Sequence, residues 1–403
     1  MPKLRFDSSL ADDAGWSLPL CEPRRVLVGE PDGRAILDGT RIGNVRDGLR
    51  WLDRERREHA GWRWAGYLSY DLGRLFEPAA QFRPRATALP LYALAEVPVS
   101  SRASRAAHVA TPSDSGAAKA TPASNFTRDG YLAAVQRCLD YIAAGDIFQV
   151  NLSQRLRVPF VSTAAALYDA LLARSPADYG ALLDFTDLLG FAVVSNSPEL
   201  LVRVDADGRA ITRPIKGTRP RTTAMDRALA DSEKDAAELN MIVDLERNDL
   251  GRVCEIGSVH VTQRRTVEAH PTIYHGVATV EGQLRRDVDL LALLTAIFPG
   301  GSITGAPKIR AMQIIDELEP DTRGPYCGAV GHFDADGSLQ LNVAIRTATL
   351  ADDQLTIPVG GGIVADSEPV AEFDETLVKA AALLDAVEYA KRGSVQLVVA
   401  APT

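Results

Sequence analysis

The segment RPIKGTRPR, Arg213 to Arg221, places four cationic side chains in nine residues, and Lys216 is its only lysine. A lysine amine becomes nucleophilic when its pKa falls, and both neighbouring cations and loss of water lower that pKa. The segment could be a solvated basic loop, an anion-binding patch, or a site of covalent chemistry at Lys216. The net charge of −9 argues against general nucleic-acid binding, so no nucleic-acid partner is expected.

Two predicted helices each carry acidic side chains on one face. Glu372, Glu375 and Lys379 are spaced i, i+3 and i+7, and Asp235 and Glu238 are spaced i, i+3. Two such faces could share one divalent ion, and oxygen ligands beside an anionic substrate would suit Mg²⁺. Acidic pairs at this spacing are also common on solvated helices, so the pattern alone leaves both interpretations open.

Two glycine-rich segments offer backbone rather than side chains to a ligand. FPGGSITGAPK (298–308) precedes a predicted helix, so its N–H groups could hold an anion, although the spacing does not match a P-loop. The alternative for this segment is a tight turn. VGGGIVADSEP (359–369) places three glycines at the end of a predicted strand, where a ligand could approach the backbone closely.

Two single charged residues add candidate ligand contacts. Arg346, in the predicted strand LQLNVAIRTATL, could bind a carboxylate through two parallel hydrogen bonds or lie at a sheet edge in water. Glu199 follows a proline at the end of a predicted strand and could act as a general acid. The histidines show no metal-binding spacing, and the four cysteines form no CxxC pair. These features together describe a pocket for a small polycarboxylate with Mg²⁺.

The local patterns predict an α+β protein. Residues 127–145 have helical periodicity between an N-cap at Thr127 and a stop at Gly145, and IFQVNLSQRLRV alternates as a strand, with Phe148 on its apolar face and Gln149 on the other. Strands come in meanders with helices interspersed, which favours α+β over a doubly wound sheet.

Composition suggests how the chain is divided and where it works. Residues 101–125 are rich in Ala, Ser, Thr and Pro and are predicted to form a flexible connection between residues 1–100 and 126–392, with a tail at 393–403. We see neither a secretory signal nor an apolar run of membrane-spanning length. A cytoplasmic protein with no membrane partner is therefore expected.

Seven segments, in order along the chain, resemble the motifs of the chorismate-utilising enzymes. This family includes the synthases of anthranilate, aminodeoxychorismate, isochorismate and salicylate. The similarity covers roughly residues 125–390, and GYLSYDLGR extends it into the N-terminal part. The segments are SPELL, PIKGTRPR, DLERNDLGRV, FPGGSITGAPK, GAVGHF, IRTA and GGGIVADSEPVAEFDETLVKA.

The resemblance implies a fold and a set of site residues. Antiparallel sheets packed together and flanked by helices are implied, with the active site between them. Glu238 and Glu375, supported by Asp235 and Glu372, are implied to hold Mg²⁺, and Glu199 is implied as the general acid. Substrate contacts are implied for Tyr326, Arg346, Gly360, Gly361, Gly362, Lys379, Thr218, His275 and Gln149.

Two positions distinguish members of this family. Isochorismate and salicylate synthases have a water-activating lysine where this chain has Gln149, and a glutamine has no basic pKa for that role. At the position of Lys216, anthranilate synthases usually have alanine, in the motif P-I-A-G-T. Aminodeoxychorismate synthases often have lysine there, in the motif P-I-K-G-T, and so does this chain. The resemblance therefore predicts amination of chorismate at C4. Lys216 would attack C2, Glu199 would protonate the departing hydroxyl, and ammonia would add at C4 and expel the lysine.

The ammonia is expected to come from a separate glutamine amidotransferase subunit, because neither Cys254 nor Cys327 has the sequence context of a glutaminase nucleophile. The chain ends soon after DAVEYAKR, so release of pyruvate to give para-aminobenzoate is expected to need another enzyme. Two alternatives stay open: anthranilate synthase component I, and a non-catalytic regulator that binds chorismate or an aromatic amino acid. Nucleotide binding at the glycine-rich segments is disfavoured by their spacing.

Overall fold

The computed structural model describes residues 1–10, 16–77, 80, 82–85, 87, 89–99, 122–270 and 273–391. Most of the connection predicted at 101–125 and the tail predicted at 393–403 lie outside these ranges. Ala123–Ser124 (β8) lies inside them and pairs with Gln149–Pro159 (β9), so this end of the predicted connection is a short strand. In the described part of the chain, no helix is long and apolar enough to cross a membrane.

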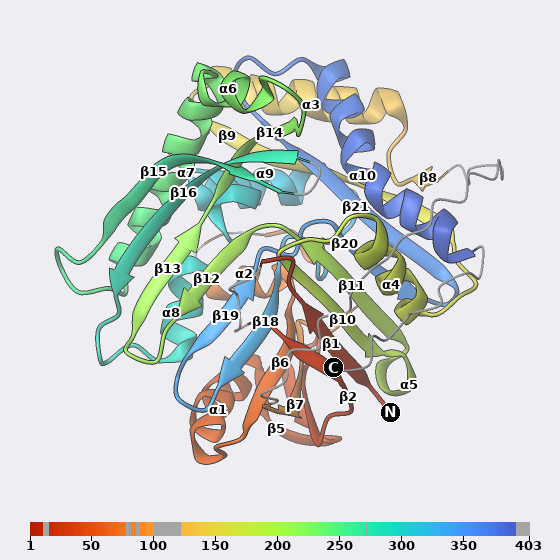
Figure 1. The fold of residues 1–403 in the computed structure, drawn as a ribbon, viewed down its shortest axis with the longest axis vertical. Coiled ribbons are helices and arrows are strands. Elements are labelled where there is room, and N and C mark those ends of the chain that lie inside the picture. Colours follow the sequence, from red (N-terminus) through yellow and green to blue (C-terminus); the bar gives the residue numbers. More distant parts are fainter. Residues whose placement is uncertain are drawn as a thin grey trace.

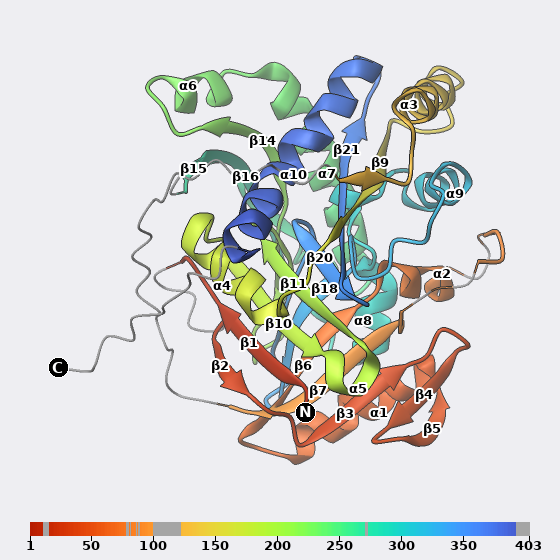
Figure 2. The ribbon, with the colours of Figure 1, turned by 90° about the vertical axis from the view of Figure 1, so that its right-hand side faces the viewer.

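Two antiparallel sheets pack against each other and carry helices on their outer faces, as the α+β expectation requires (Figures 1 and 2). Within the described residues the first sheet has nine strands. They are β1 (Lys3–Asp7), β2 (Leu18–Cys21), β8, β9, β10 (Tyr179–Phe185), β11 (Phe191–Ser197), β17 (Gly305–Ala306), β20 (Thr347–Ala351) and β21 (Gln354–Ile363).

The second sheet has twelve strands in the same described ranges. They are β3 (Arg25–Gly29), β4 (Arg34–Leu37), β5 (Thr40–Asn44), β6 (Trp62–Leu68), β7 (Tyr92–Pro98), β12 (Leu200–Val204), β13 (Arg209–Arg213), β14 (Ile215–Pro220), β15 (His260–Ala269), β16 (Ile273–Gln283), β18 (Ala329–Asp334) and β19 (Leu339–Asn342). Because β1 pairs with β10 and β6 pairs with β18, the N-terminal hundred residues are built into both sheets.

The two sheets bury an apolar layer between them. Phe6, Trp16, Tyr67, Phe185 and Phe191 are at most 1–2% exposed and lie in this layer. Separate apolar clusters cover the outer faces, where the helices pack. The arrangement is therefore helices, sheet, sheet and helices, and a residue at the seam between the sheets can be held from both sides.

Helices cover the outer faces of both sheets. In Figure 1, α4 and α10 lie together beside the nine-stranded sheet, and α1 and α8 lie beside the twelve-stranded sheet. The helices are α1 (Val45–Glu58), α2 (Gly73–Phe76), α3 (Arg128–Ala143), α4 (Ala164–Arg174), α5 (Thr186–Leu189), α6 (Met225–Ala230), α7 (Glu233–Gly251), α8 (Leu290–Ile297), α9 (Lys308–Leu318) and α10 (Pro369–Lys391), with 3₁₀ turns η1 (Tyr70–Leu72) and η2 (Gly301–Ile303).

The helix predicted at 127–145 is confirmed as α3. The hydroxyl of Thr127 accepts a hydrogen bond from the backbone N–H of Gly130 at 3.0 Å, which caps the first turn. Gly145 follows the helix with φ of +81°, a left-handed conformation that glycine adopts without strain.

The alternation predicted along β9 is wrong at its first residue. Phe148 precedes the strand and is 71% exposed, while the residues from Gln149 to Gln154 are all buried. β9 pairs with β17 and β21 and is covered on both faces, so polar residues are buried along it as well as apolar ones. Because β9 is buried on both faces, the alternation of apolar and polar residues along it does not predict which side chains are exposed.

Two of the points at which the chain crosses from one sheet to the other lie next to each other. Glu199 lies between β11 of one sheet and β12 of the other, and residues 343–346 lead back from β19 to β20. The crossings are hydrogen-bonded to each other: Val343 N–H donates to the Glu199 carbonyl at 2.9 Å, and Asn196 N–H donates to the Arg346 carbonyl at 3.1 Å. Arg346 was expected within a strand; it lies instead in this crossing with φ of +49°.

Candidate active site

The three glycines of β21 bring four polar side chains together. A Cβ at Gly362 would lie 2.7 Å from Gln149 Nε2 and 3.6 Å from Lys216 Nζ. A Cβ at Gly361 would lie 3.0 Å from Glu372 Oε2 and 3.8 Å from Lys379 Nζ. The Lys379 amine also donates to the Gly360 carbonyl at 2.9 Å. Because Gly361 and Gly362 are successive strand residues, Gln149 and Lys216 lie over one face of this glycine floor, and Glu372 and Lys379 lie over the other. The bare backbone there is open to a ligand.

Lys216 is the cation of the opening segment that faces this floor. Arg213 pairs with Glu268, Arg219 donates to Asp235 at 2.7 Å, and Arg221 donates to a backbone carbonyl at 3.1 Å. Lys216, by contrast, makes no hydrogen bond or ion pair within the described ranges.

Burial sets the protonation of Lys216. Loss of water lowers the pKa of its amine, and the nearby Lys379 lowers it further, while Glu238 and Glu199 act in the opposite direction. Of the two expected causes, loss of water is the larger, and the neighbouring cation that adds to it is Lys379 rather than an arginine of the segment. A lowered pKa increases the fraction of neutral, nucleophilic amine at a given pH.

Glu199 lies close to Lys216 and is 4% exposed. Burial raises the pKa of its carboxyl, and the Ser302 hydroxyl, the charge of Lys216 and the Ile215 backbone N–H partly oppose that effect. Its Oε1 atom has no hydrogen bond of normal geometry in the described structure. A buried carboxyl that favours its protonated form suits a general acid.

Arg346 and His275 lie next to each other at the same seam. Burial lowers the pKa of His275 to about 3, and the charge of Arg346 adds to this, so the imidazole stays neutral. His275 Nδ1 lies 2.9 Å from Thr218 Oγ1, and its Nε2 is buried without a partner in the described residues. The Arg346 guanidinium has no ion pair there either. A planar cation and an unpaired ring nitrogen can together bind a carboxylate.

Unpaired buried polar atoms gather around this site. Both side-chain amide atoms of Gln149 lack a hydrogen-bond partner in the described structure, as do Glu199 Oε1, His275 Nε2 and Ser302 Oγ. Buried polar groups without partners are costly unless a ligand or water satisfies them. Their clustering indicates a polar ligand site, which runs from fully buried Gln149 out to Glu375 and Lys379, whose side chains are 54% and 44% exposed.

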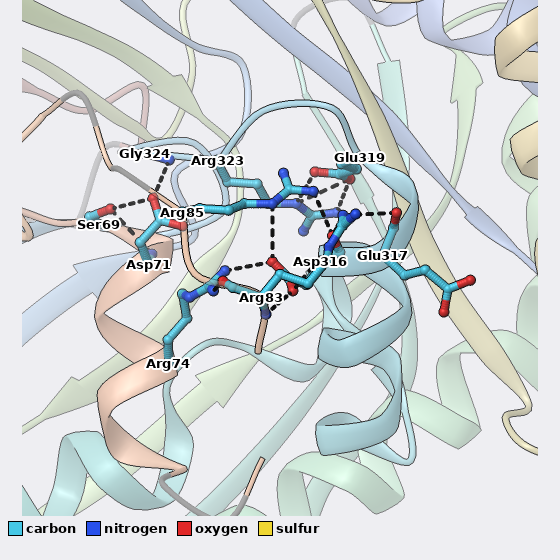
Figure 3. A network of polar contacts seen from close by, with 10 residues as sticks. All are labelled: Ser69, Asp71, Arg74, Arg83, Arg85, Asp316, Glu317, Glu319, Arg323 and Gly324. Carbon is cyan, nitrogen blue, oxygen red and sulfur yellow. Dashed lines mark hydrogen bonds and ion pairs between the residues drawn. The ribbon is translucent and has the colours of Figure 1, made fainter. Parts of the chain in front are cut away.

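The segment that carries Tyr326 is anchored by a buried network (Figure 3). Arg323 donates to Glu319 at 2.7 Å and to the carbonyls of Ile303 and Asn151, each at 2.8 Å. Asp71 accepts from the Gly324 N–H at 2.8 Å. Two residues beyond Gly324, Tyr326 is 5% exposed, and the next backbone N–H donates to Ala344 in the crossing at 2.9 Å. The Tyr326 segment is thus tied through its backbone to the crossing that carries Arg346.

The acidic residues expected to hold Mg²⁺ are neighbours, although they are not a preformed metal site. Burial raises the pKa of Glu238 and Glu372, and the charge of Glu375 adds to both effects. Burial alone would raise the pKa of Glu375 too, but Lys379, 2.8 Å away, holds it below the ordinary value. Asp235 is paired with Arg219. Over the described ranges, no three metal-ligating side chains are gathered at binding distance. The carboxylate oxygens fit a hard divalent cation in chemical type.

The segment FPGGSITGAPK forms a tight turn held by contacts within the protein. Lys308, the first residue of α9, pairs with Asp249, and Thr304 folds back onto the Gly300 carbonyl at 2.9 Å. Gly305 pairs with Val150 of β9. The turn brings Ser302 close to Glu199, and anion binding at the N–H groups of the helix start stays a prediction.

Two residues near the site had no signal in the sequence. Asp178 is buried beside Arg346, accepts from Ser9 at 2.6 Å, and lies 3.5 Å from His270. Arg323 anchors the Tyr326 segment through contacts distant in sequence. Asp178 meets Ser9 and His270, which are 169 and 92 residues away, so no local pattern marks it. Arg323 has one nearby partner, Glu319 at i−4, but its bonds to Ile303 and Asn151 depend on the tertiary fold.

Replacing Gly362 with alanine should damage the site while sparing the fold. The new methyl would displace the Gln149 amide, which is the movable end of a side chain, and would narrow the space beside Lys216. We expect kcat/KM for chorismate to fall about a hundredfold, the scale of small misplacements in active sites, with a melting temperature close to that of the wild type. Gly251→Ala, which meets no atom within 4 Å, is the control. An unchanged kcat/KM for Gly362→Ala would show that these glycines do not line the active site.

The amine of Lys216 should titrate below the ordinary range of a lysine. Reductive ¹³C-methylation of the metal-free protein, followed by NMR titration, measures this pKa. Because the Glu238 anion stabilises the ammonium form, Glu238→Gln should lower the pKa of Lys216 further. A pKa in the ordinary range of lysine, in both proteins, would show that burial does not control this amine.

Comparison with known proteins identifies the family. A model of the family described as chorismate binding enzyme matches residues 22–385. The chain is 48% identical over 278 residues to anthranilate synthase component 1 1 of Haloarcula marismortui, and 47% identical over 272 residues to aminodeoxychorismate synthase of Streptomyces griseus. These alignments cover 68% and 66% of this chain, but 56% and 37% of the two relatives. The chain thus spans about half or less of the length of such curated relatives.

Solved structures agree on the fold. Anthranilate synthase component I from Streptococcus pneumoniae TIGR4 aligns with a TM-score of 0.78 at 27% identity, over 95% of this chain and 92% of that one. The menaquinone-specific isochorismate synthase from Escherichia coli aligns with a TM-score of 0.68 at 20% identity, over 96% and 95% of the two chains, and shares the fold. With the family match over most of its length, the chain belongs to the chorismate-binding enzymes.

Proposed function

We propose that this protein aminates chorismate at C4 to give 4-amino-4-deoxychorismate, with Lys216 as the nucleophile. The observation that carries the proposal is the place of the Lys216 amine. It faces the glycine floor beside Gln149, is free of ion pairs in the described residues, and has its pKa lowered by burial. Since Gln149 cannot activate water, Lys216 is the nucleophile that the pocket offers to C2.

The proposed reaction has two displacement steps, and atoms and charge balance over the pair. The neutral Lys216 amine bonds to C2, both double bonds of the ring diene shift, and the C4–O bond breaks as Glu199 gives its proton to the departing hydroxyl, releasing water. Ammonia then bonds to C4, both double bonds shift back, and the C2–N bond breaks to return Lys216 as a neutral amine. The new C4 ammonium gives a proton to the Glu199 carboxylate, which restores the acid.

The remaining pocket residues hold the substrate in this proposal. Arg346 and Tyr326 bind the enolpyruvyl carboxylate, supported by His275 and Thr218. The ring carboxylate lies over the backbone of Gly360–Gly362, near Lys379. Glu238 and Glu375, with Glu372 and Asp235 in support, would hold Mg²⁺, which supplies positive charge to offset the ring carboxylate.

A glutamine amidotransferase subunit completes the proposal as the source of ammonia. Ammonium salts at high concentration can replace such a subunit in an assay, so the synthase activity can be measured on this chain alone.

Anthranilate synthase component I is the second candidate. The names of most of the similar relatives favour it, including those of Pseudomonas putida and Thermus thermophilus, at 47% and 45% identity. In that reaction ammonia would attack C2 directly, and Lys216 would only hold a carboxylate. The pocket retains Glu199, Lys216, Arg346 and the paired acidic helices, which argues against a purely regulatory protein.

The product formed from chorismate, Mg²⁺ and ammonium salt distinguishes the two candidates. We expect 4-amino-4-deoxychorismate, with no anthranilate fluorescence. Lys216→Ala should lower C4 amination about 10³-fold or more, the scale of losing a covalent nucleophile, and could divert residual product to the C2 amine.

Lys216→Arg is the matched control for that experiment. It keeps a cation but supplies no neutral amine, so it should be as inactive as Lys216→Ala if Lys216 is the nucleophile. Wild-type production of anthranilate without an added lyase, or near-normal C4 amination by Lys216→Arg, would reject the proposal.

The acidic helix faces predict the metal dependence. Glu375→Gln removes a charged oxygen ligand, so the Mg²⁺ concentration needed for half-maximal activity should rise about tenfold or more. Asp374→Asn, on the exposed side of the same helix, should leave it unchanged. An unaltered Mg²⁺ dependence of activity in Glu375→Gln would show that other residues bind the metal.

A further inference from the structure

Two of the four carboxylates proposed to hold Mg²⁺ are already paired with cations of this chain. Asp235, on α7, accepts a hydrogen bond from the Arg219 guanidinium at 2.7 Å. On α10, Glu375 Oε1 lies 2.8 Å from Nζ of Lys379, one helical turn further along. Each cation occupies an oxygen that a hard metal ion would need as a ligand. The two pairs therefore compete with a metal ion for the same carboxylates.

Lys379 is the paired cation that also reaches the glycine floor. Its amine donates to the Gly360 carbonyl at 2.9 Å, and a Cβ at Gly361 would lie 3.8 Å from the same nitrogen. An ammonium group has three donors, so the contacts with Gly360 and Glu375 leave one donor over. Because the Lys379 side chain is 44% exposed, its amine can turn from one acceptor to another without disturbing the core.

The charges around this amine change once the site is loaded. Glu372 lies over the same face of the floor as Lys379, and Glu375 follows it on α10. Burial acts to raise the pKa of both carboxyls, whereas the charge of Lys379 and, to a smaller extent, that of Lys234 lower it. A divalent ion on these carboxylates would supply two positive charges in place of one and would repel the ammonium group. The substrate brings a new anion, the ring carboxylate proposed to lie over Gly360–Gly362.

We propose that Lys379 exchanges one carboxylate for another when the site is loaded. As Glu375 turns to Mg²⁺, the Lys379 amine leaves it, stays on the Gly360 carbonyl and binds the ring carboxylate of the substrate. The inference rests on the metal ligands and the substrate placement of the proposed function. Lys379 then couples the two ligands: the metal ion frees the amine and the substrate retains it, so each ligand raises the affinity for the other by the same factor.

Calorimetry of the full chain with Mg²⁺ alone measures the first half of the exchange. Lys379→Met removes the competing cation at similar length, so Mg²⁺ should bind about fivefold more tightly than in the wild type. Lys391→Met is the matched control, because Lys391 also pairs with a glutamate on α10, Glu388, at 3.5 Å. It should leave Mg²⁺ binding unchanged. An equal or weaker Mg²⁺ affinity in Lys379→Met would overturn the inference.

Chorismate binding without ammonium salt measures the second half. Its dissociation constant is determined with and without Mg²⁺, and the ratio of the two values reports how strongly the metal ion favours the substrate. In Lys379→Met this ratio should fall about fivefold, because no amine is left for the metal ion to release. Lys391→Met should keep the wild-type ratio. The same ratio in Lys379→Met and in the wild type would show that Lys379 does not couple the two ligands.

Glu375→Gln separates a failure of this inference from a failure of the proposed function. It should weaken Mg²⁺ binding in the same calorimetry, because a charged ligand is lost. If it binds Mg²⁺ as the wild type does, the proposed metal ligands are wrong and the inference falls with them. If Glu375→Gln binds Mg²⁺ weakly while Lys379→Met gains no affinity, only the exchange is wrong. Neither measurement depends on the ring carbon that is aminated.

Discussion

The hydrogen-bonded pair of sheet crossings is the constraint on which the site depends. Glu199 and Arg346 each lie where the chain leaves one sheet for the other, and backbone hydrogen bonds of 2.9 and 3.1 Å link the two crossings. An acid and a carboxylate-binding cation are thereby set at a fixed separation by backbone rather than by flexible side chains. The left-handed conformation of Arg346 is the local strain that this junction requires. The remaining site elements are organised around it: β14 with Lys216 from one sheet, and β9 and β21 from the other.

Burial acts in the same direction on three titratable groups of this seam. It lowers the pKa of Lys216 and His275 and raises that of Glu199, so each group moves toward its neutral form. A neutral amine and a protonated acid are the states that a nucleophile and a general acid require, and they arise here from one cause. The carboxylates on the acidic helices raise the pKa of Lys216 and so oppose the effect of burial. A cation bound to those carboxylates would weaken this opposition and favour the neutral amine.

The sequence predicted the parts of this structure whose causes are local. α3 was found from its periodicity and its cap at Thr127, and α7 and α10 from the spacing of their acidic residues. The alternation that placed Phe148 in the core failed because β9 is covered on both faces, and Arg346 was placed in a strand because a crossing between sheets leaves no mark in the apolar pattern. Ser302 was missed because only the tertiary fold brings it close to Glu199, and Arg323 was missed because its bonds to Ile303 and Asn151 form only in the folded chain. The family motifs supplied the site residues that spacing alone left open.

The carboxyl and the amine of the proposed reaction are held by the same stretch of backbone. Glu199 accepts a hydrogen bond from the backbone N–H of Ile215, the residue before Lys216, and Ile215 and Lys216 both belong to β14 of the twelve-stranded sheet. β14 is paired with β16 on either side of Lys216, so the sheet sets the reach of the amine relative to the carboxyl. In the proposed reaction, attack at C2 and loss of the C4 hydroxyl would therefore be coupled by backbone geometry rather than by side-chain movement.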